Sequence, residues 1–143
     1  MKTITLLFLH CFTLICFSQE IIEKNYDTFD SFLKEQANKI ESISEGMTQE
    51  MTKNKMGGSI LVKVPAVGKM KALNQVFKQP EFVNKYARDP ERVIDILWYF
   101  STPKDQNGVI SKNECTPVIF ENDSLVGKGW SFLQAYRRSG KMR

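Results

Sequence analysis

The segment from Val93 to Phe100, VIDILWYF, constrains the fold more than any other part of the sequence. It is rich in β-branched and aromatic residues, which favour an extended strand. Successive side chains of a strand project to opposite faces, and both faces of this strand are largely apolar. We therefore expect a strand that is covered on both sides. One face carries Ile94, Ile96, Trp98 and Phe100, and the other carries Val93, Asp95, Leu97 and Tyr99.

Other short segments predict further strands. SILVKV, residues 59–64, has the same alternation, and Val118 to Phe120 is another β-branched run. The dipeptide Asn122-Asp123 predicts a tight turn that leads into SLVGKGWSFL, residues 124–133. Residues 93–100, 118–120 and 124–133 together predict a three-stranded antiparallel meander.

Two segments have the residue spacing of helices. Between Ile22 and Met47, apolar residues recur at intervals of three, four or seven, which is typical of an amphipathic helix, here interrupted by Gln36. This helix either packs on its own domain or serves as a coiled coil or partner-binding helix. Residues 67–77 predict a second helix, which Pro80 ends.

The remaining connections are predicted to be irregular. Residues 81–91, EFVNKYARDPE, predict a loop or short helix that ends in a turn at Asp89-Pro90. The polar stretch after residue 100 has a turn signal at Asn107-Gly108, and Gly57-Gly58 predicts a turn or hinge.

These elements predict an α+β fold, with one or two helices packed on a small three-stranded antiparallel meander and preceded by the amphipathic helix. Residues 20–55 are net acidic and residues 56–143 are net basic, so their charges favour docking of the helix on its own domain. The predicted organisation is a signal peptide at 1–18, an acidic helical segment at 19–56, an α+β domain at 57–135 and a basic tail at 136–143.

The first 18 residues have the pattern of a secretory signal peptide. Lys2 precedes an apolar run that ends at Phe17, and this run is shorter than the roughly 20 residues of a membrane-spanning helix. We expect a mature chain that starts near Gln19 and is periplasmic or secreted. Lipid attachment at Cys16 is the less favoured alternative, because the bulky Ile15 stands where a lipoprotein signal has a small residue.

The sequence argues against enzymatic chemistry. The only histidine, His10, lies in the predicted signal peptide, so the mature chain has no Ser-His-Asp triad, Cys-His pair or histidine-containing zinc site. Of the three cysteines only Cys115 lies outside that peptide, which excludes an intramolecular disulfide and favours a buried, structural thiol. We therefore expect no enzyme, cofactor or metal site. The small net charge of +4 requires no nucleic-acid partner.

Two surfaces are candidate binding sites. Gly127 and Gly129 share a face of the predicted last strand and leave a shallow trough there. Either an aromatic side chain, Trp98 or Phe120, covers this trough, or a ligand binds in it. The tail AYRRSGKMR is either a solvated end or a patch for anionic phospholipid or an acidic partner. The candidate binding residues are Gly127, Gly129, Trp130, Arg137 and Arg138.

Part of the chain resembles the BamE/SmpA/OmlA lipoproteins of the bacterial envelope. The resemblance rests on a helix start at Gly68, the proline at Pro80, the strand through Trp98-Tyr99 and the hairpin TPVIFENDSLVGKGWSFL from Thr116 to Leu133. Gly46-Met47-Thr48 is a rival helix start. The resemblance covers about Gly68 to Leu133, and it implies an α+β fold and a scaffold or binding role, with no catalytic residue.

The function expected from the sequence is that of a non-catalytic secreted or periplasmic binding or scaffold module of the cell envelope. Its partner is expected to be a protein or the envelope surface. An alternative is an inhibitor or immunity-type protein that captures a secreted enzyme. A further alternative is a histidine-free enzyme that uses Asp89, Glu91 and Asp95, although turn formation and one charge on a strand also explain these residues.

Processing of the chain tests the predicted signal peptide. The intact mass of the exported protein should correspond to loss of about the first 18 residues. A mature protein that begins with a lipid-modified Cys16 would contradict a soluble product, and an uncleaved chain would indicate an anchored one.

Overall fold

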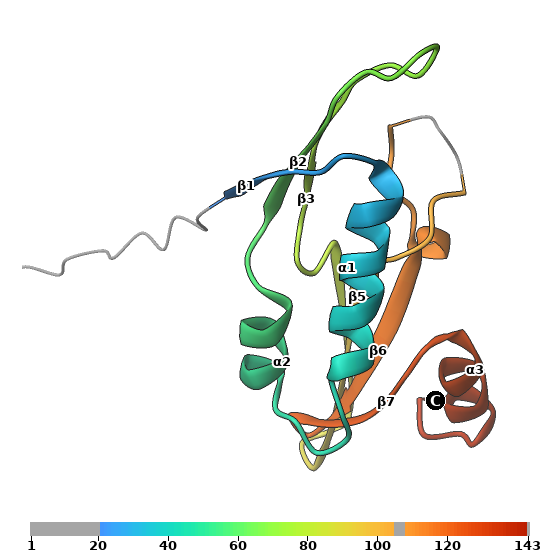
Figure 1. The fold of residues 1–143 in the computed structure, drawn as a ribbon. Coiled ribbons are helices and arrows are strands. Elements are labelled where there is room, and N and C mark those ends of the chain that lie inside the picture. The colour runs from blue at the N-terminus through green and yellow to red at the C-terminus, as the bar shows by residue number, and fades with distance from the viewer. Residues whose placement is uncertain (1–20, 105–107, 143) are drawn as a thin grey trace, which may run out of the picture.

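The computed structural model describes residues 21–104 and 108–142. The predicted signal peptide, Cys16 and Asn107 lie outside these residues. The elements, in chain order (Figure 1), are β1 (Ile22–Asn25), α1 (Phe29–Ser42), α2 (Gln49–Met56), β2 (Ile60–Val64), β3 (Leu73–Phe77), β4 (Phe82–Asp89), β5 (Arg92–Phe100), the 3-10 helix η1 (Lys112–Glu114), β6 (Cys115–Glu121), β7 (Ser124–Lys128) and α3 (Trp130–Arg138).

The strands form two sheets. β5 lies inside a four-stranded antiparallel sheet of order β4-β5-β6-β7, and a separate three-stranded sheet has the order β1-β2-β3. In the smaller sheet, β1 is parallel to β2, and β3 is antiparallel to it. The predicted α+β class is confirmed. The arrangement differs from the expected one because β4 adds a fourth strand and because a second sheet is present.

Both faces of β5 are buried, as its sequence predicts. Ile94, Ile96, Trp98 and Phe100 belong to one apolar cluster, together with Leu133 of α3 and Phe77 of the smaller sheet. Leu97 and Tyr99 belong to a second cluster, which contains Ile40 of α1 and Met56 of α2. The helices therefore cover the central strand from both sides.

The apolar pattern between Ile22 and Met47 spans three elements rather than one helix. Ile22 begins β1, α1 starts after the N-cap Thr28, and Met47 follows the end of α1. Of the predicted apolar residues, Ile40 and Ile43 are buried, while Tyr26, Phe29, Leu33 and Met47 are partly buried and Ile22 is exposed. The most buried side chains of α1 also include Phe32 and Gln36, the residue expected to interrupt the stripe. Docking on the same chain is therefore the arrangement that the structure adopts.

The predicted helix at residues 67–77 is wrong. Gly68, with φ of +59°, lies in a turn, and Leu73 to Phe77 forms β3. Leu73, Gln75 and Phe77 are more buried than the two residues between them, which is the period of a strand. Pairing of β3 with β2 decided the outcome, because a five-residue apolar pattern fits both periods.

Two further predictions are corrected. Residues 81–91, expected to be a loop or short helix, contain β4, which pairs with β5 along most of its length. The last strand ends at Lys128 instead of Leu133, because Gly129 has a φ of +88° that turns the chain out of the sheet. The helix α3 then places Leu133 and Tyr136 in the core.

Lys128 connects the sheet to the end of α1. Its ammonium group donates hydrogen bonds to the carbonyl oxygens of Ile40 at 2.7 Å, and of Glu41 and Ile43 at 3.0 Å. The last carbonyls of a helix have no partner within the helix and carry partial negative charge. A cation at this position therefore satisfies three acceptors at once and fixes α1 relative to β7.

Replacing Lys128 with Met tests this connection. Lys128→Met should lower the free energy of unfolding by about 2 kcal/mol, because the carbonyls lose a charged donor while the aliphatic stem is retained. Urea denaturation measures the change. Lys34→Met, at an exposed position of α1, is the control and should stay within about 0.5 kcal/mol of wild type. Equal stability of the two variants would contradict the role of Lys128.

Candidate functional site

The two glycines expected to form a trough do not share one surface. Gly127 is buried, and a Cβ atom added there would lie 2.4 Å from the ring of Phe132. The β6–β7 pairing shifts register here, because Ile119 pairs with Gly127 and Phe120 with Leu125, which leaves Val126 as the extra residue of a bulge on β7. Phe132, rather than Trp98 or Phe120, is therefore the aromatic residue that covers this glycine. Gly129 is the N-cap of α3.

The other predicted binding residues lie on α3. Trp130 is 37% exposed, its indole N–H donates to the carbonyl of Cys115 at 3.0 Å, and its ring lies 5.4 Å from that of Trp98. Arg137 and Arg138 are exposed in the last turn, where positive charge complements the helix dipole. These side chains follow one helix and do not converge on a common hollow.

The start of the predicted basic tail is part of the fold. Tyr136 is buried, and its hydroxyl donates to Glu121 at 2.6 Å. Lys141 lies 4.0 Å from the same carboxylate and 5.3 Å from the ring centre of Tyr136. The boundary predicted between residues 135 and 136 therefore falls inside α3.

The acidic residues considered for catalysis are separately engaged. Asp95 is buried, accepts a hydrogen bond from Gln49 at 2.7 Å and lies 3.7 Å from Lys85. Glu91 is in the turn between β4 and β5, where its backbone carbonyl accepts from Asn122. The side chain of Asp89 lies outside the described part of the structure.

Cys115 is buried, as the sequence predicts. Burial, followed by the negative charges of Glu81 and Glu114, raises the pKa of its thiol from 9.0 to about 12. The thiolate is the nucleophilic form of cysteine, so this side chain is unreactive at neutral pH.

An open hollow of about 480 Å³ lies at the end of the smaller sheet, where β1 and β2 end and β3 begins. Its walls are both apolar and polar, with an ammonium and a carboxylate among them. Residues that line it are Asn25, Tyr26, Asp27, Lys63, Val64, Pro65, Ala72, Leu73 and Asn74. Sequence analysis missed this site, because the predicted helix at 67–77 removed one of its walls.

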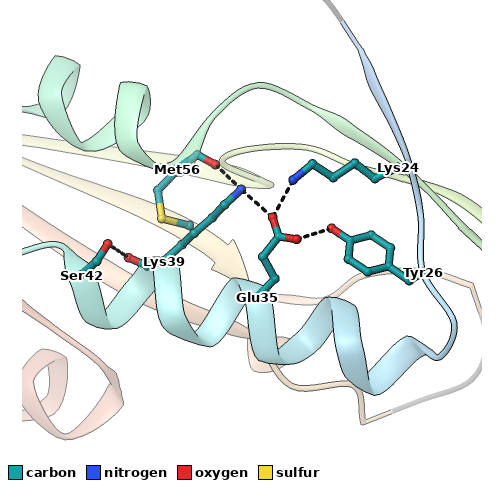
Figure 2. Close-up of polar contacts among 6 residues, drawn as sticks. All are labelled: Lys24, Tyr26, Glu35, Lys39, Ser42 and Met56. Carbon is teal, nitrogen blue, oxygen red and sulfur yellow. Dashed lines mark hydrogen bonds and ion pairs between the residues drawn. The ribbon is translucent and has the colours of Figure 1, made fainter.

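Glu35 of α1 holds the Tyr26 wall of the hollow in place. Figure 2 shows that its carboxylate faces three donors: Lys24 at 2.7 Å, the Tyr26 hydroxyl at 2.8 Å and Lys39 at 3.3 Å. Lys39 also donates to the carbonyl of Met56 at 3.2 Å. The cluster therefore connects β1, α1 and the end of α2.

The donors determine the titration of this cluster. Partial burial acts to raise the pKa of the Glu35 carboxyl, but hydrogen bonds from the three donors outweigh it and lower this pKa from 4.5 to about 2. Burial and the hydrogen bond to Glu35 raise the pKa of Tyr26 above its ordinary value. Glu35 is thus charged and Tyr26 is protonated at neutral pH.

A hairpin rises from the edge of the hollow. Residues 65–72, PAVGKMKA, connect β2 to β3, and all eight are exposed. We call them the 65–72 hairpin. In Figure 1 the connection between β2 and β3 extends well away from the helices and the larger sheet. Val67 and Met70 are 61% and 71% exposed, so their apolar side chains contribute little to the core.

The sequence segment that contains the 65–72 hairpin carries charge of one sign. Residues 51–80 contain six lysines and no aspartate or glutamate. Lys63 pairs with Glu23 at 2.7 Å, but within the described residues no carboxylate forms an ion pair with Lys69 or Lys71. This run of lysines is visible in the sequence and is the signal that could have identified the surface. None of the helices in the described part of the chain is long and apolar enough to span a membrane.

The pH dependence of stability tests the Glu35 cluster. Because the pKa of Glu35 is lower in the folded protein, its contribution is complete above about pH 4.5 and is lost as the pH falls toward 2. Glu35→Gln should therefore cost about 1 kcal/mol at pH 7, a modest value because the side chain is partly exposed. Its difference from wild type should shrink below pH 4.5.

Chemical denaturation at several pH values measures this difference. Glu45→Gln changes an exposed carboxylate outside the cluster and should leave the profile unchanged. A difference between wild type and Glu35→Gln that stays constant from pH 7 to pH 2 would be inconsistent with the assigned role.

Comparison with known proteins places the chain in one family. The model of a family described as a protein of unknown function, DUF3192, matches residues 14–136. No curated protein and no solved structure gives a significant match. Since the family match covers most of the sequence, the chain belongs to the DUF3192 family.

Proposed function

We propose that this protein is a non-catalytic binding module of the bacterial cell envelope, and that it binds through the 65–72 hairpin and the hollow at its base. One observation carries the proposal: eight consecutive exposed residues present apolar side chains and unpaired lysines that the core does not use. Exposed apolar groups that stabilise nothing in the monomer are typical of interaction sites.

The envelope location is supported by the sequence. Residues 1–18 have the pattern of a cleaved signal peptide, and a periplasmic or secreted product is part of the proposal. The resemblance to the BamE/SmpA/OmlA lipoproteins is part of the proposal as well, although one of the features that carry it is lost, because Gly68 begins no helix. Of the two helix starts considered, Gly46-Met47-Thr48 precedes α2, and Thr48 is its N-cap.

A binding role is favoured over catalysis because the reactive groups are engaged elsewhere. Cys115 is buried with a raised pKa, Asp95 is held by Gln49 and Lys85, and Glu35 is held by three donors. General acid–base catalysis by a carboxyl group is most efficient when its pKa lies near the working pH, whereas the pKa of Glu35 is lowered to about 2.

The inhibitor alternative has one observation in its favour. A hairpin that extends from the body is convex, and a convex element fits the concave active-site cleft of an enzyme. In this case the partner of the 65–72 hairpin would be a secreted enzyme, captured in a one-to-one complex.

Site-specific photocrosslinking in producing cells tests the proposal. A benzophenone amino acid at position 67 or 70 should form adducts with one envelope component, because these side chains are exposed at the hairpin. The matched control is position 51, since Met51 on α2 is 54% exposed but lies outside the hairpin.

Unchanged melting temperatures would show that the three variants are folded. Adducts found equally at position 51, or at none of the three positions, would contradict binding through the hairpin. A one-to-one adduct with a secreted hydrolase would select the inhibitor alternative.

A further inference from the structure

We propose that the 65–72 hairpin binds the surface of an anionic phospholipid bilayer, with Val67 and Met70 among the lipid chains and Lys69 and Lys71 at the phosphates. This inference rests on the proposed function, whose binding surface it uses, and it names the occupant of that surface.

The backbone places the two apolar side chains together. Val67 and Met70 form an antiparallel bridge across a two-residue turn, and the N–H of Met70 donates to the carbonyl of Val67 at 3.0 Å. Directly opposed residues of an antiparallel pair project to the same face. The hairpin therefore presents one small apolar face at the turn.

Two lysines are next to Met70 in the sequence. Lys69 is in the turn and Lys71 follows Met70, and both are exposed. A lysine side chain lies along apolar surface through its methylene groups while its ammonium reaches polar headgroups. Apolar side chains flanked by lysines are the combination that holds a segment at the interface of an anionic bilayer.

The composition of the hairpin favours a bilayer over an acidic protein. Its only polar side chains are the two lysines; residues 65–72 contain no amide, hydroxyl or carboxylate side chain. The hairpin thus offers charge and apolar contact with few directional hydrogen bonds. A fluid bilayer surface can accommodate the hairpin without a preformed binding site, whereas a protein partner needs a surface complementary to it in shape.

Vesicle flotation tests the assignment. The mature chain should bind vesicles of phosphatidylglycerol and phosphatidylcholine in equal amounts, and it should not bind vesicles of phosphatidylcholine alone. Replacing Lys69 and Lys71 with Gln should weaken partitioning about fivefold for each lysine. Met70→Ser should weaken it as well, and added salt should reduce binding of wild type.

Matched variants separate the hairpin from general charge. Lys34→Gln with Lys53→Gln makes the same change in net charge at exposed positions of α1 and α2, and Met51→Ser removes a methionine exposed outside the hairpin. Both should partition like wild type. Equal loss in these controls would overturn the assignment, because binding would then depend on net charge alone.

Two further results would overturn the lipid assignment. The first is no binding of wild type to the anionic vesicles. The second is hairpin-dependent crosslinking to an acidic protein in the absence of vesicle binding, which would leave the proposed binding function intact. Failure of the crosslinking at positions 67 and 70 would instead count against the proposed function itself.

Discussion

The central strand β5 buries side chains on both of its faces, so the fold requires a cover on each side. α1 and α2 cover Leu97 and Tyr99, while α3 and the smaller sheet complete the core around Ile96 and Trp98. α1, α2 and the smaller sheet come from the N-terminal half of the chain and α3 from its C-terminal end, and each must be held at its own angle. Lys128 does this for α1, because its ammonium binds the helix end directly to β7. The arrangement of helices and sheets thus follows from the need to bury both faces of β5.

Only part of the smaller sheet packs into this core. Ile60, Val62 and Phe77 pack into the core, so the part of the sheet near these residues is fixed. Beyond Val64 the two strands have no further body to pack against, and the connection between them lies in solvent. Glu35 stabilises the place where this connection leaves the core, since it holds Tyr26 at the hollow. The packed part of the smaller sheet thus positions the 65–72 hairpin, while the hairpin itself stays outside the core.

The sequence predicts elements whose pattern is local and fails where long-range pairing decides. The alternation in residues 93–100 and the Asn122-Asp123 turn were sufficient to identify β5 and the hairpin of β6 and β7. The short pattern of Leu73 to Phe77 fits both a helix and a strand, and only pairing with β2 selects the strand. The same error affects the candidate site, because a helix at 67–77 would leave no exposed hairpin. The absence of acidic residues from 51 to 80 is nevertheless evident in the sequence.

The close approach of Gly127 and Phe132 has a consequence for how this sequence can vary. A methyl group at position 127 and an aromatic ring at position 132 cannot occupy the same space, since they would be 2.4 Å apart. The two positions are therefore coupled: glycine at 127 leaves room for the ring at 132, and a larger residue at 127 requires that ring to move or to be replaced by a smaller side chain. Among members of the family, substitutions at these positions should covary, although four residues and the end of a strand lie between them.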